Sequence, residues 1–419
     1  MQVHIYKKVR KAPSSLYHLD QAVDLRLINT ILTQLPTFLG DIRGKRIALT
    51  AGSRKIANAP AILKAAGEAL KEAGANPFVI AAMGSHGGGT QDGQIEVLEE
   101  LGITEETTDM QIVAWNSWTD YGYTETPFND AAAQADGIVL FNRVKPHTSF
   151  HGDIESGLCK MLVIGLGGPI GAKAVHALEL TAISPEIKRR AQLLAGELPL
   201  LAGIAVVEDE NDMLMDMRLC AGHEIVTTDR ELLHIAKDNM PHIPVAKADI
   251  LVVKEIGKCF SGTGMDTNII SRLRIQGAAE PPERFSRIIA LRLAEAAGGN
   301  GYGIGLADFT TAECEQAIDR RPMYLNALTS GFTMRAMLPI ICTNDEEALL
   351  AAAKSLGMHI SQANIVIIKN TLDLSTIAIL YGKDAMPDNT HAPNNIPGYE
   401  LAQVMPLAFV NGRISDNII

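Results

Sequence analysis

A regular alternation of short apolar runs with amphipathic stretches constrains the fold of this chain more than any other feature. Residues 46–50 and 76–83 are apolar runs of strand length, and residues 59–74 and 94–101 carry apolar side chains at helical spacing. This order is typical of a parallel sheet covered by helices. Ligands of such sheets bind at the loops after the carboxyl ends of the strands. The polar loops that follow the two strands are therefore the first places to seek a site.

The same alternation continues along the chain and restarts near residue 245. Further strands are expected at 137–141, 201–207, 249–255 and 364–369, and further helices at 185–195 and 285–297. A chain of 419 residues is long for one compact domain and natural for two. We therefore predict two α/β domains with mainly parallel sheets and an active-site cleft between them. The expected ranges are 1–247 for the N-terminal domain, 248–393 for the C-terminal domain, and 394–419 for a tail. A return of this tail to the N-terminal domain is left open.

Composition excludes several classes of protein. The chain has 37 Lys and Arg against 48 Asp and Glu, and this net charge of −11 argues against a broad nucleic-acid-binding face. The five cysteines are widely spaced without a CxxC pair, so a zinc ribbon, an iron–sulfur cluster and a disulfide framework are not expected. The first residues lack the apolar core of a signal peptide, and no apolar run is long enough to span a bilayer. We expect a cytoplasmic protein that binds neither nucleic acid nor membrane.

Two polar segments carry most of the side chains that can do chemistry. The run GSHGGGT at 84–90 follows an expected strand, and its His86 is either a general base or a solvated residue of a tight turn. The segment 142–160 combines basic, acidic and imidazole side chains, and it ends at Lys160 beside an apolar run. That lysine is either desolvated, which would make its amine nucleophilic, or packed along its stem with a hydrated amine. Taken alone, the residues favour the hydrated amine.

Three further features stay open at this point. His176 lies on an apolar helical stretch, as a core residue or as a metal ligand that only Glu179 could join from the same face. One imidazole and one carboxylate fall short of a zinc site. Arg54, after the first strand, suits a bidentate grip on a carboxylate or an ordinary surface position. The Gly-containing loop 257–268, with Arg274 beyond it, is a ligand-facing loop or, slightly favoured, a plain turn.

Taken together, these segments resemble the nickel-pincer-nucleotide lactate racemase family and its wider group of 2-hydroxyacid racemases and epimerases. The residues that carry the resemblance are GSR at 52–54, AMGSHGGGT at 82–90, KPH at 145–147, ESGLCKM at 155–161, and His176. Lys160 and His176 are 16 residues apart, which matches the family's interval between its cofactor lysine and its metal histidine. The resemblance covers most of the chain.

The resemblance implies a specific cofactor. This is nickel held in pyridinium-3,5-bisthiocarboxylic acid mononucleotide, whose nucleotide is tethered to a lysine, here Lys160. Two sulfurs and a ring carbon bind the metal, and His176 would fill its fourth position. Ser156, Gly157 and Gly167 are the further residues that we expect to contact the cofactor in the N-terminal domain. Sulfur and imidazole are both suitable ligands for nickel.

The resemblance also implies a reaction and its residues. His86 and His147 match the family's acid/base pair, and His151 is kept as an alternative to His147. Arg54 matches the arginine that binds the substrate carboxylate, and Arg274 is a second expected contact of the substrate. The family's aspartate before that arginine is Ala51 here, which puts lactate in doubt as the substrate more than it does the cofactor.

We therefore predict an isomerase, a 2-hydroxyacid racemase or epimerase that works by hydride transfer to and from the nickel cofactor. Its expected partners are a small 2-hydroxy acid and the enzymes that build the cofactor, and its oligomeric state stays open. One alternative is an oxidoreductase that uses nicotinamide or another nucleotide, although the run IGLGGPIG at 164–171 lacks the dinucleotide-binding spacing. Another alternative is a non-catalytic protein that binds a small anion.

Overall fold

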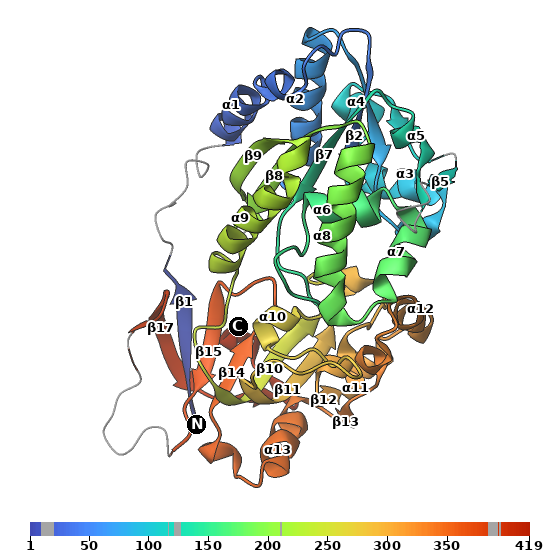
Figure 1. Ribbon diagram of the computed structural model, residues 1–419. Helices are drawn as coiled ribbons and strands as arrows, with labels where there is room; N and C mark the ends of the chain where they lie inside the picture. Colours follow the sequence, from blue (N-terminus) through green and yellow to red (C-terminus); the bar gives the residue numbers. More distant parts are fainter. Residues whose placement is uncertain (10–20, 116, 121–126, 210–211, 384–392, 394) are drawn as a thin grey trace. The chain divides into compact units, whose positions relative to one another are not determined.

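The computed structural model describes residues 1–9, 21–115, 117–120, 127–209, 212–383, 393 and 395–419. Its contacts divide the chain into two compact units, Pro13–Met240, and Met1–Ala12 with Pro241–Ile419 (Figure 1). The division falls after residue 240, close to the expected boundary at 247. The expected start of the tail at 394 lies outside the described residues.

The first unit alternates strands and helices along most of its length. Its main elements are α1 Gln21–Leu32, β2 Arg46–Ala51, α2 Ala59–Glu72, β3 Asn76–Ala81, α3 Gln91–Glu100, α4 Glu105–Thr108, β4 Ile112–Val113, β5 Trp118–Asp120, β6 Pro127–Asn129, α5 Asp130–Ala133, β7 Gly137–Arg143, α6 Leu158–Lys160, η3 Met161–Gly165, α7 Gly168–His176, α8 Leu180–Glu197, β8 Leu200–Glu208, β9 Leu214–Ala221 and α9 Ile225–Asp238. The α/β class predicted from the alternation is confirmed.

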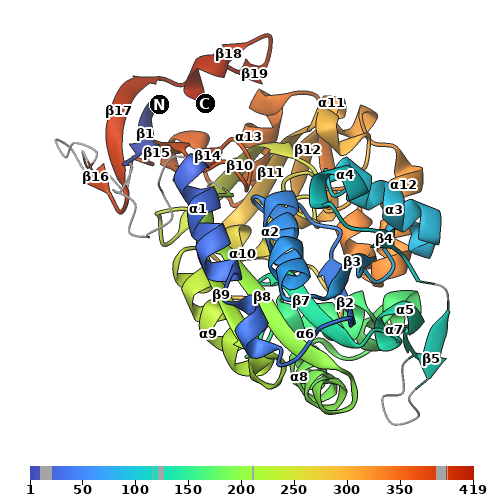
Figure 2. The ribbon, with the colours of Figure 1, turned by 90° about the horizontal axis from the view of Figure 1, so that it is seen from above.

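The main sheet of this unit has the order β4-β3-β2-β7-β8-β9, and only β9 runs antiparallel to its neighbour. Successive residues of β2 enter different apolar clusters, Ala48 on one face of the sheet and Leu49 on the other. Helix α2 covers the face of Leu49, and α8 covers the face of Ala48 (Figure 2). Burial on both faces explains why these strands are apolar throughout rather than alternating.

The order of the strands reverses between β2 and β7. The chain passes from β2 outward through β3 to β4, and it then returns to the other side of β2 as β7. At such a switch point the loops after the two central strands diverge to opposite faces and leave a crevice at their carboxyl ends. The loops 52–58 and 144–157 lie at this crevice, so the topology itself places Arg54 and His147 at its edge.

The segment 158–176 is a bent pair of short helices packed into the first unit. Most of its residues are buried, and helix η3 within it is a π-helix, a rare form that is frequent at functional sites. Within the described residues no single helix is long and apolar enough to cross a membrane. The segments Leu158–Gly165 and Gly168–His176 reach that length and apolarity only when the two, bent by 110°, are counted together.

The second unit is built on a nine-stranded sheet of order β13-β12-β11-β10-β14-β15-β1-β17-β16. Strands β13 to β14 in this order are parallel, and the others are antiparallel. Its elements are β1 Gln2–Lys8, β10 Ala248–Ile256, α10 Thr267–Ile270, β11 Phe285–Leu293, β12 Phe309–Thr311, α11 Ala312–Gln316, α12 Arg320–Ser330, β13 Ile340–Cys342, α13 Asp345–Ser355, β14 Ile365–Ile368, β15 Thr376–Leu380, β16 Asn395–Ile396, β17 Tyr399–Pro406, β18 Phe409–Val410 and β19 Arg413–Ile414.

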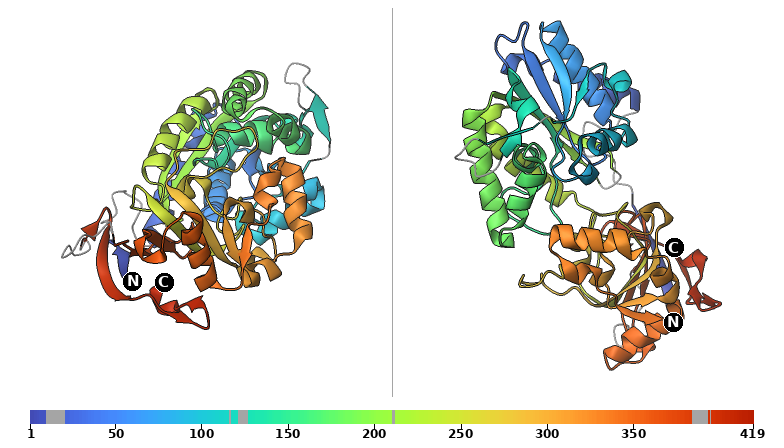
Figure 3. Two further views of the ribbon diagram at one scale, coloured as in Figure 1. Left: turned by 90° about the horizontal axis from the view of Figure 1, so that it is seen from below. Right: turned by 90° about the vertical axis from the view of Figure 1, so that its right-hand side faces the viewer.

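One expectation for this unit was wrong. The helix expected at 285–297 is largely strand β11, because the apolar run at Ile288–Leu291 lies between β10 and β12 and is buried on both faces. The tail contributes β17, which pairs with β1 in the second sheet. Figures 1 and 3 agree in placing the blue strand β1 beside the red strand β17. Strands close to both ends of the chain thus belong to one sheet.

Candidate active site

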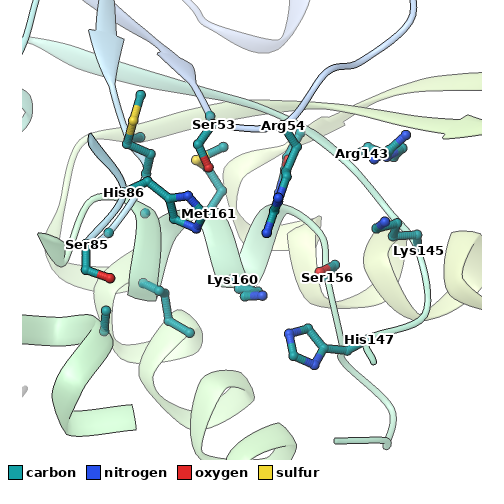
Figure 4. A pocket seen from close by; sticks show the side chains of 18 of the residues that line it. Ser53, Arg54, Ser85, His86, Arg143, Lys145, His147, Ser156, Lys160 and Met161 are labelled. Atoms are coloured by element: carbon teal, nitrogen blue, oxygen red, sulfur yellow. The ribbon is translucent and has the colours of Figure 1, made fainter. Parts of the chain in front are cut away.

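A cavity with an empty volume of about 980 Å³, part of it open to solvent, lies at the switch point of the first unit (Figure 4). The loops after β2, β3 and β7 form its wall together with α6, η3 and α7. The predicted site residues among its lining are Arg54, His86, His147, Ser156, Lys160 and His176. Four other predicted residues, His151, Gly157, Gly167 and Arg274, are not part of the lining. Segments up to 124 positions apart in the sequence therefore meet here, as the loop rule for parallel sheets predicts.

Lys160 is held in place by a buried carboxylate from a distant helix. The backbone N–H groups of Leu158 and Cys159 each donate to Asp229 of α9, both at 2.8 Å. A Cβ on Gly157 would come within 2.4 Å of the same carboxylate, so a larger residue there would have to displace it. Asp229 lies about 70 positions further along the chain. Sequence reasoning missed it because nothing in its local sequence marks a helix-capping role.

The surroundings of Lys160 favour a reactive amine. Burial, then the charge of Arg54 and then that of Lys145, lower the pKa of Lys160 to about 7. Figure 4 shows Arg54 directed towards Lys160, in agreement with this influence. A lysine with this pKa is substantially neutral at physiological pH, and only the neutral amine is a nucleophile. The structure thus departs from the hydrated amine that the residues alone favoured.

His86 lies in a glycine-rich turn that hydrogen bonds from two neighbouring helices hold in place. Gly84 has φ 62°, a left-handed conformation that suits glycine, and its N–H donates to the carbonyl of Gly165 in η3 at 3.2 Å. The buried Gln94 of α3 donates from Nε2 to the carbonyl of Gly84 at 3.0 Å. The imidazole of His86 is exposed in the cavity wall, opposite the side of Arg143 and Lys145 (Figure 4).

The loop after β7 distinguishes the two histidines that the sequence left as alternatives. His147 lines the cavity and stacks on Phe150 with ring centroids 4.1 Å apart. Burial first, and then the positive charge of Lys160, hold the pKa of His147 well below its ordinary value. His151 lies outside the lining, with its Nδ1 3.3 Å from the carboxylate of Glu155. The structure therefore brings His147, not His151, to the other candidate residues.

The lining is cationic. Arg54, Arg143, Lys145 and Lys160 contribute to it, whereas none of the described lining residues is Asp or Glu. Arg143 forms an ion pair with Glu208, which is buried behind it and also accepts from the N–H of Ala57. A cavity with this charge suits an anionic ligand.

His176 is the last residue of α7 and shares the cavity with Lys160. Part of His176 is exposed to solvent, but protein atoms surround its ring. This burial, and to a smaller extent the charge of Lys160, lowers the pKa of His176 to about 4. Its imidazole is thus neutral at pH 7, the form that binds metals. No group of three His, Cys, Asp or Glu among the described residues could hold a metal ion. A metal at His176 would need donor atoms from a non-protein group, and a tethered cofactor with sulfur donors fits that requirement.

Arg274 belongs to the second unit and is already engaged. Its guanidinium donates to Asp308 Oδ1 at 2.6 Å, and Arg272 donates to Oδ2 of the same carboxylate at 2.6 Å. Its expected role in substrate binding stays a prediction. The loop 257–268 is held largely by its own hydrogen bonds, such as those of Asp266 with Asn268 and of Thr263 with Met265.

Comparison with known proteins finds no family model that matches the chain and no curated protein that is significantly similar in sequence. The fold is similar to that of a Thermotoga maritima protein from a structural genomics programme, with 12% identity, a TM-score of 0.49, and coverage of 80% of this chain and 91% of that one. It is also similar to the lactate racemase apoprotein of Thermoanaerobacterium thermosaccharolyticum, with 14% identity, a TM-score of 0.47, and coverage of 82% and 85%.

Proposed function

We propose that this protein is a 2-hydroxyacid racemase or epimerase that carries a nickel-pincer nucleotide on Lys160. The observation that carries the proposal is the meeting of Lys160 and His176 in one cavity, with the pKa of the lysine at about 7. A neutral amine can be acylated, and a neutral imidazole can bind a metal. Each residue is thus in the protonation state that its proposed role needs.

The remaining lining residues suit the handling of a 2-hydroxy acid. When bound, the cofactor would supply a reversible acceptor for the hydride at the substrate's Cα. Arg54 would bind the carboxylate, since a guanidinium offers two parallel donors to it. His86 and His147 would act on the substrate's hydroxyl group. The cationic lining would keep the acid in its carboxylate form.

The test is co-expression with the enzymes that build the cofactor, followed by intact mass, nickel content and peptide mapping. We expect an adduct on Lys160, stoichiometric nickel, and interconversion of the enantiomers of at least one acid in a panel of mono- and dicarboxylic 2-hydroxy acids. Lys160→Ala should lose the adduct, and His176→Ala should keep the adduct and lose nickel. If Lys160 stays unmodified while a lactate racemase is modified in the same cells, the proposal is wrong.

A second candidate is a binding protein for a small anion, which the cationic lining favours. His86→Gln distinguishes the two functions. A binding protein would keep its affinity for the ligand in this variant, as measured by calorimetry with 2-hydroxy acids. An enzyme would lose turnover while it retains the binding that Arg54 provides.

A further inference from the structure

The imidazole of His147 is fixed in one tautomer by its own loop. The backbone N–H of Ser149 donates to its Nδ1 at 3.1 Å. A backbone N–H can only donate, so Nδ1 must carry a lone pair and the proton of the neutral ring must lie on Nε2. A proton on Nδ1, in the other tautomer or in the imidazolium, would place two donors against each other.

The surrounding contacts keep the ring in this position. The side chain of Glu155 is fully buried, and it accepts from the backbone N–H of His147 at 2.6 Å and from Lys237 of α9 at 2.7 Å. Gly152 adds a third hydrogen bond to this carboxylate at 3.3 Å. The planes of His147 and Phe150 are 26° apart, so the ring also rests on an aromatic face. A half-turn of the imidazole would lose the hydrogen bond from Ser149.

The neighbouring histidine has the opposite arrangement. Nδ1 of His151 faces the carboxylate of Glu155, which accepts hydrogen bonds, so a proton lies on Nδ1, and in the neutral ring the lone pair lies on Nε2. This is the arrangement of a histidine that serves as a base beside a carboxylate. However, His151 is absent from the cavity lining. His147, which lines the cavity, thus has its proton on Nε2 and can donate from it. His151, whose Nε2 could act as a base, lies outside the cavity.

We propose that His147 presents its Nε2–H to an oxygen of the 2-hydroxy acid as a hydrogen-bond donor, and that His86 alone accepts the hydroxyl proton. The inference rests on the proposed function and assigns different roles to its two histidines. The hydroxyl proton passes to the imidazole of His86 and returns from it, while His147 keeps its own proton throughout. Both enantiomers then offer their hydroxyl to the same base, so inversion requires the planar 2-keto acid to turn about its C=O axis. This turn exchanges its carboxylate and its side group, so the carboxylate must leave Arg54 during inversion.

The tautomer can be measured without the cofactor. In apoprotein labelled with ¹⁵N-histidine, ring-nitrogen chemical shifts distinguish protonated from unprotonated positions. The signals of His147 are those missing from the spectrum of His147→Gln. At neutral pH we expect an unprotonated Nδ1 and a protonated Nε2. A protonated Nδ1 would overturn the proposal, whether or not Lys160 proves to be the attachment site.

A pair of variants then tests the role in turnover. His147→Gln places an amide N–H near the position of Nε2 without a basic nitrogen. His147→Asn places an amide oxygen near Nδ1, where Ser149 can still donate, but has no donor at the far end. In cofactor-loaded enzyme we expect His147→Gln to retain kcat/KM within about tenfold and His147→Asn to lose roughly 100-fold or more, the usual effect of removing an oxyanion-type donor.

The pH profile separates this donor role from a structural one. His147→Gln should keep the wild-type acidic limb of kcat/KM, because the base His86 is unchanged and must be unprotonated to accept the hydroxyl proton. Thermal melts should show both variants folded. Equal losses in the two folded variants would mean that His147 acts as a base and would refute the proposal. Absence of the Lys160 adduct would instead refute the proposed function, and the chemical shifts would still decide the state of His147.

Discussion

At the scale of single residues, the amine of Lys160 leads to the most direct prediction. Because burial and the charges of Arg54 and Lys145 lower the pKa of Lys160 to about 7, it should react with an acylating reagent at neutral pH. An ordinary lysine needs a pH near 10.4 for the same fraction of neutral amine. Peptide mapping of the apoprotein across pH 5–10 should show half-maximal modification of Lys160 near pH 7. A half-maximum near pH 10 would contradict the environment described here.

The charge of Arg54 provides a matched variant for the same measurement. Arg54→Met removes a positive charge that disfavours the ammonium form of Lys160, so the half-maximal pH should rise. Burial is the larger cause and is retained, so the midpoint should stay below that of an exposed lysine. A midpoint that does not change, or that falls, would show that Arg54 does not act on the amine.

The sequence predicted many of the site residues but not the partners that fix their states. His86, His147 and Arg54 follow strands of a parallel sheet, and such loops meet by topology. The pKa of Lys160 and the tautomer of His147 depend instead on burial and on contacts such as those of Glu155, which no local pattern encodes. The adjacent histidines, His147 and His151, looked equivalent because their difference lies in which ring nitrogen meets which partner.

At the scale of elements, the start of α6 depends on one carboxylate. Asp229→Ala would leave the N–H groups of Leu158 and Cys159 buried without their acceptor, at a cost of about 2–5 kcal/mol in the free energy of unfolding. Asp229→Asn keeps one acceptor oxygen and should lose less. Urea denaturation of the two variants measures both losses, and an effect of Asp229→Ala below about 0.5 kcal/mol would contradict the capping role.

The same carboxylate makes stability depend on pH in a predictable direction. Burial raises the pKa of Asp229 to about 6, above the value near 3.9 of an unfolded aspartate. The folded state therefore binds the proton more tightly, and stability from this group is lost as the pH rises from about 4 to above 6. The wild type should lose stability relative to Asp229→Asn over this interval, because the asparagine does not titrate. Paired unfolding curves at pH 4.5 and 7 test the sign.

Strands and helices could be predicted where the local spacing of apolar residues and their packing in the fold favour the same structure. The strands that became β2, β3, β7, β8, β10 and β14 were expected from their apolar runs, and these runs are buried on both faces of their sheets. The segment that forms β11 was expected to be helical because its apolar residues also satisfy a helical spacing. Its burial between β10 and β12 outweighs that local preference.

At the scale of the whole molecule, the second unit depends on the first eight residues of the chain. Strand β1 lies between β15 and β17 and hydrogen-bonds to both. Deletion of residues 1–8 would open two strand edges, so amides of 376–380 and 399–406 should lose their protection from hydrogen exchange. Amides of β2 and β7, which are in the other sheet, should keep theirs. Equal loss of protection in both sheets would show that the two units do not fold separately.

The position of β1 also has a consequence for how the protein is made. The strand is synthesised before its partners, which begin only at residues 376 and 399. At about 5–20 residues per second, synthesis leaves it waiting roughly 20–80 s. Meanwhile the unit of residues 13–240, which holds the whole cavity, can fold on the nascent chain. The unit that holds the cavity can therefore fold before the other one, and the second unit is completed only when β17 has been synthesised and pairs with β1.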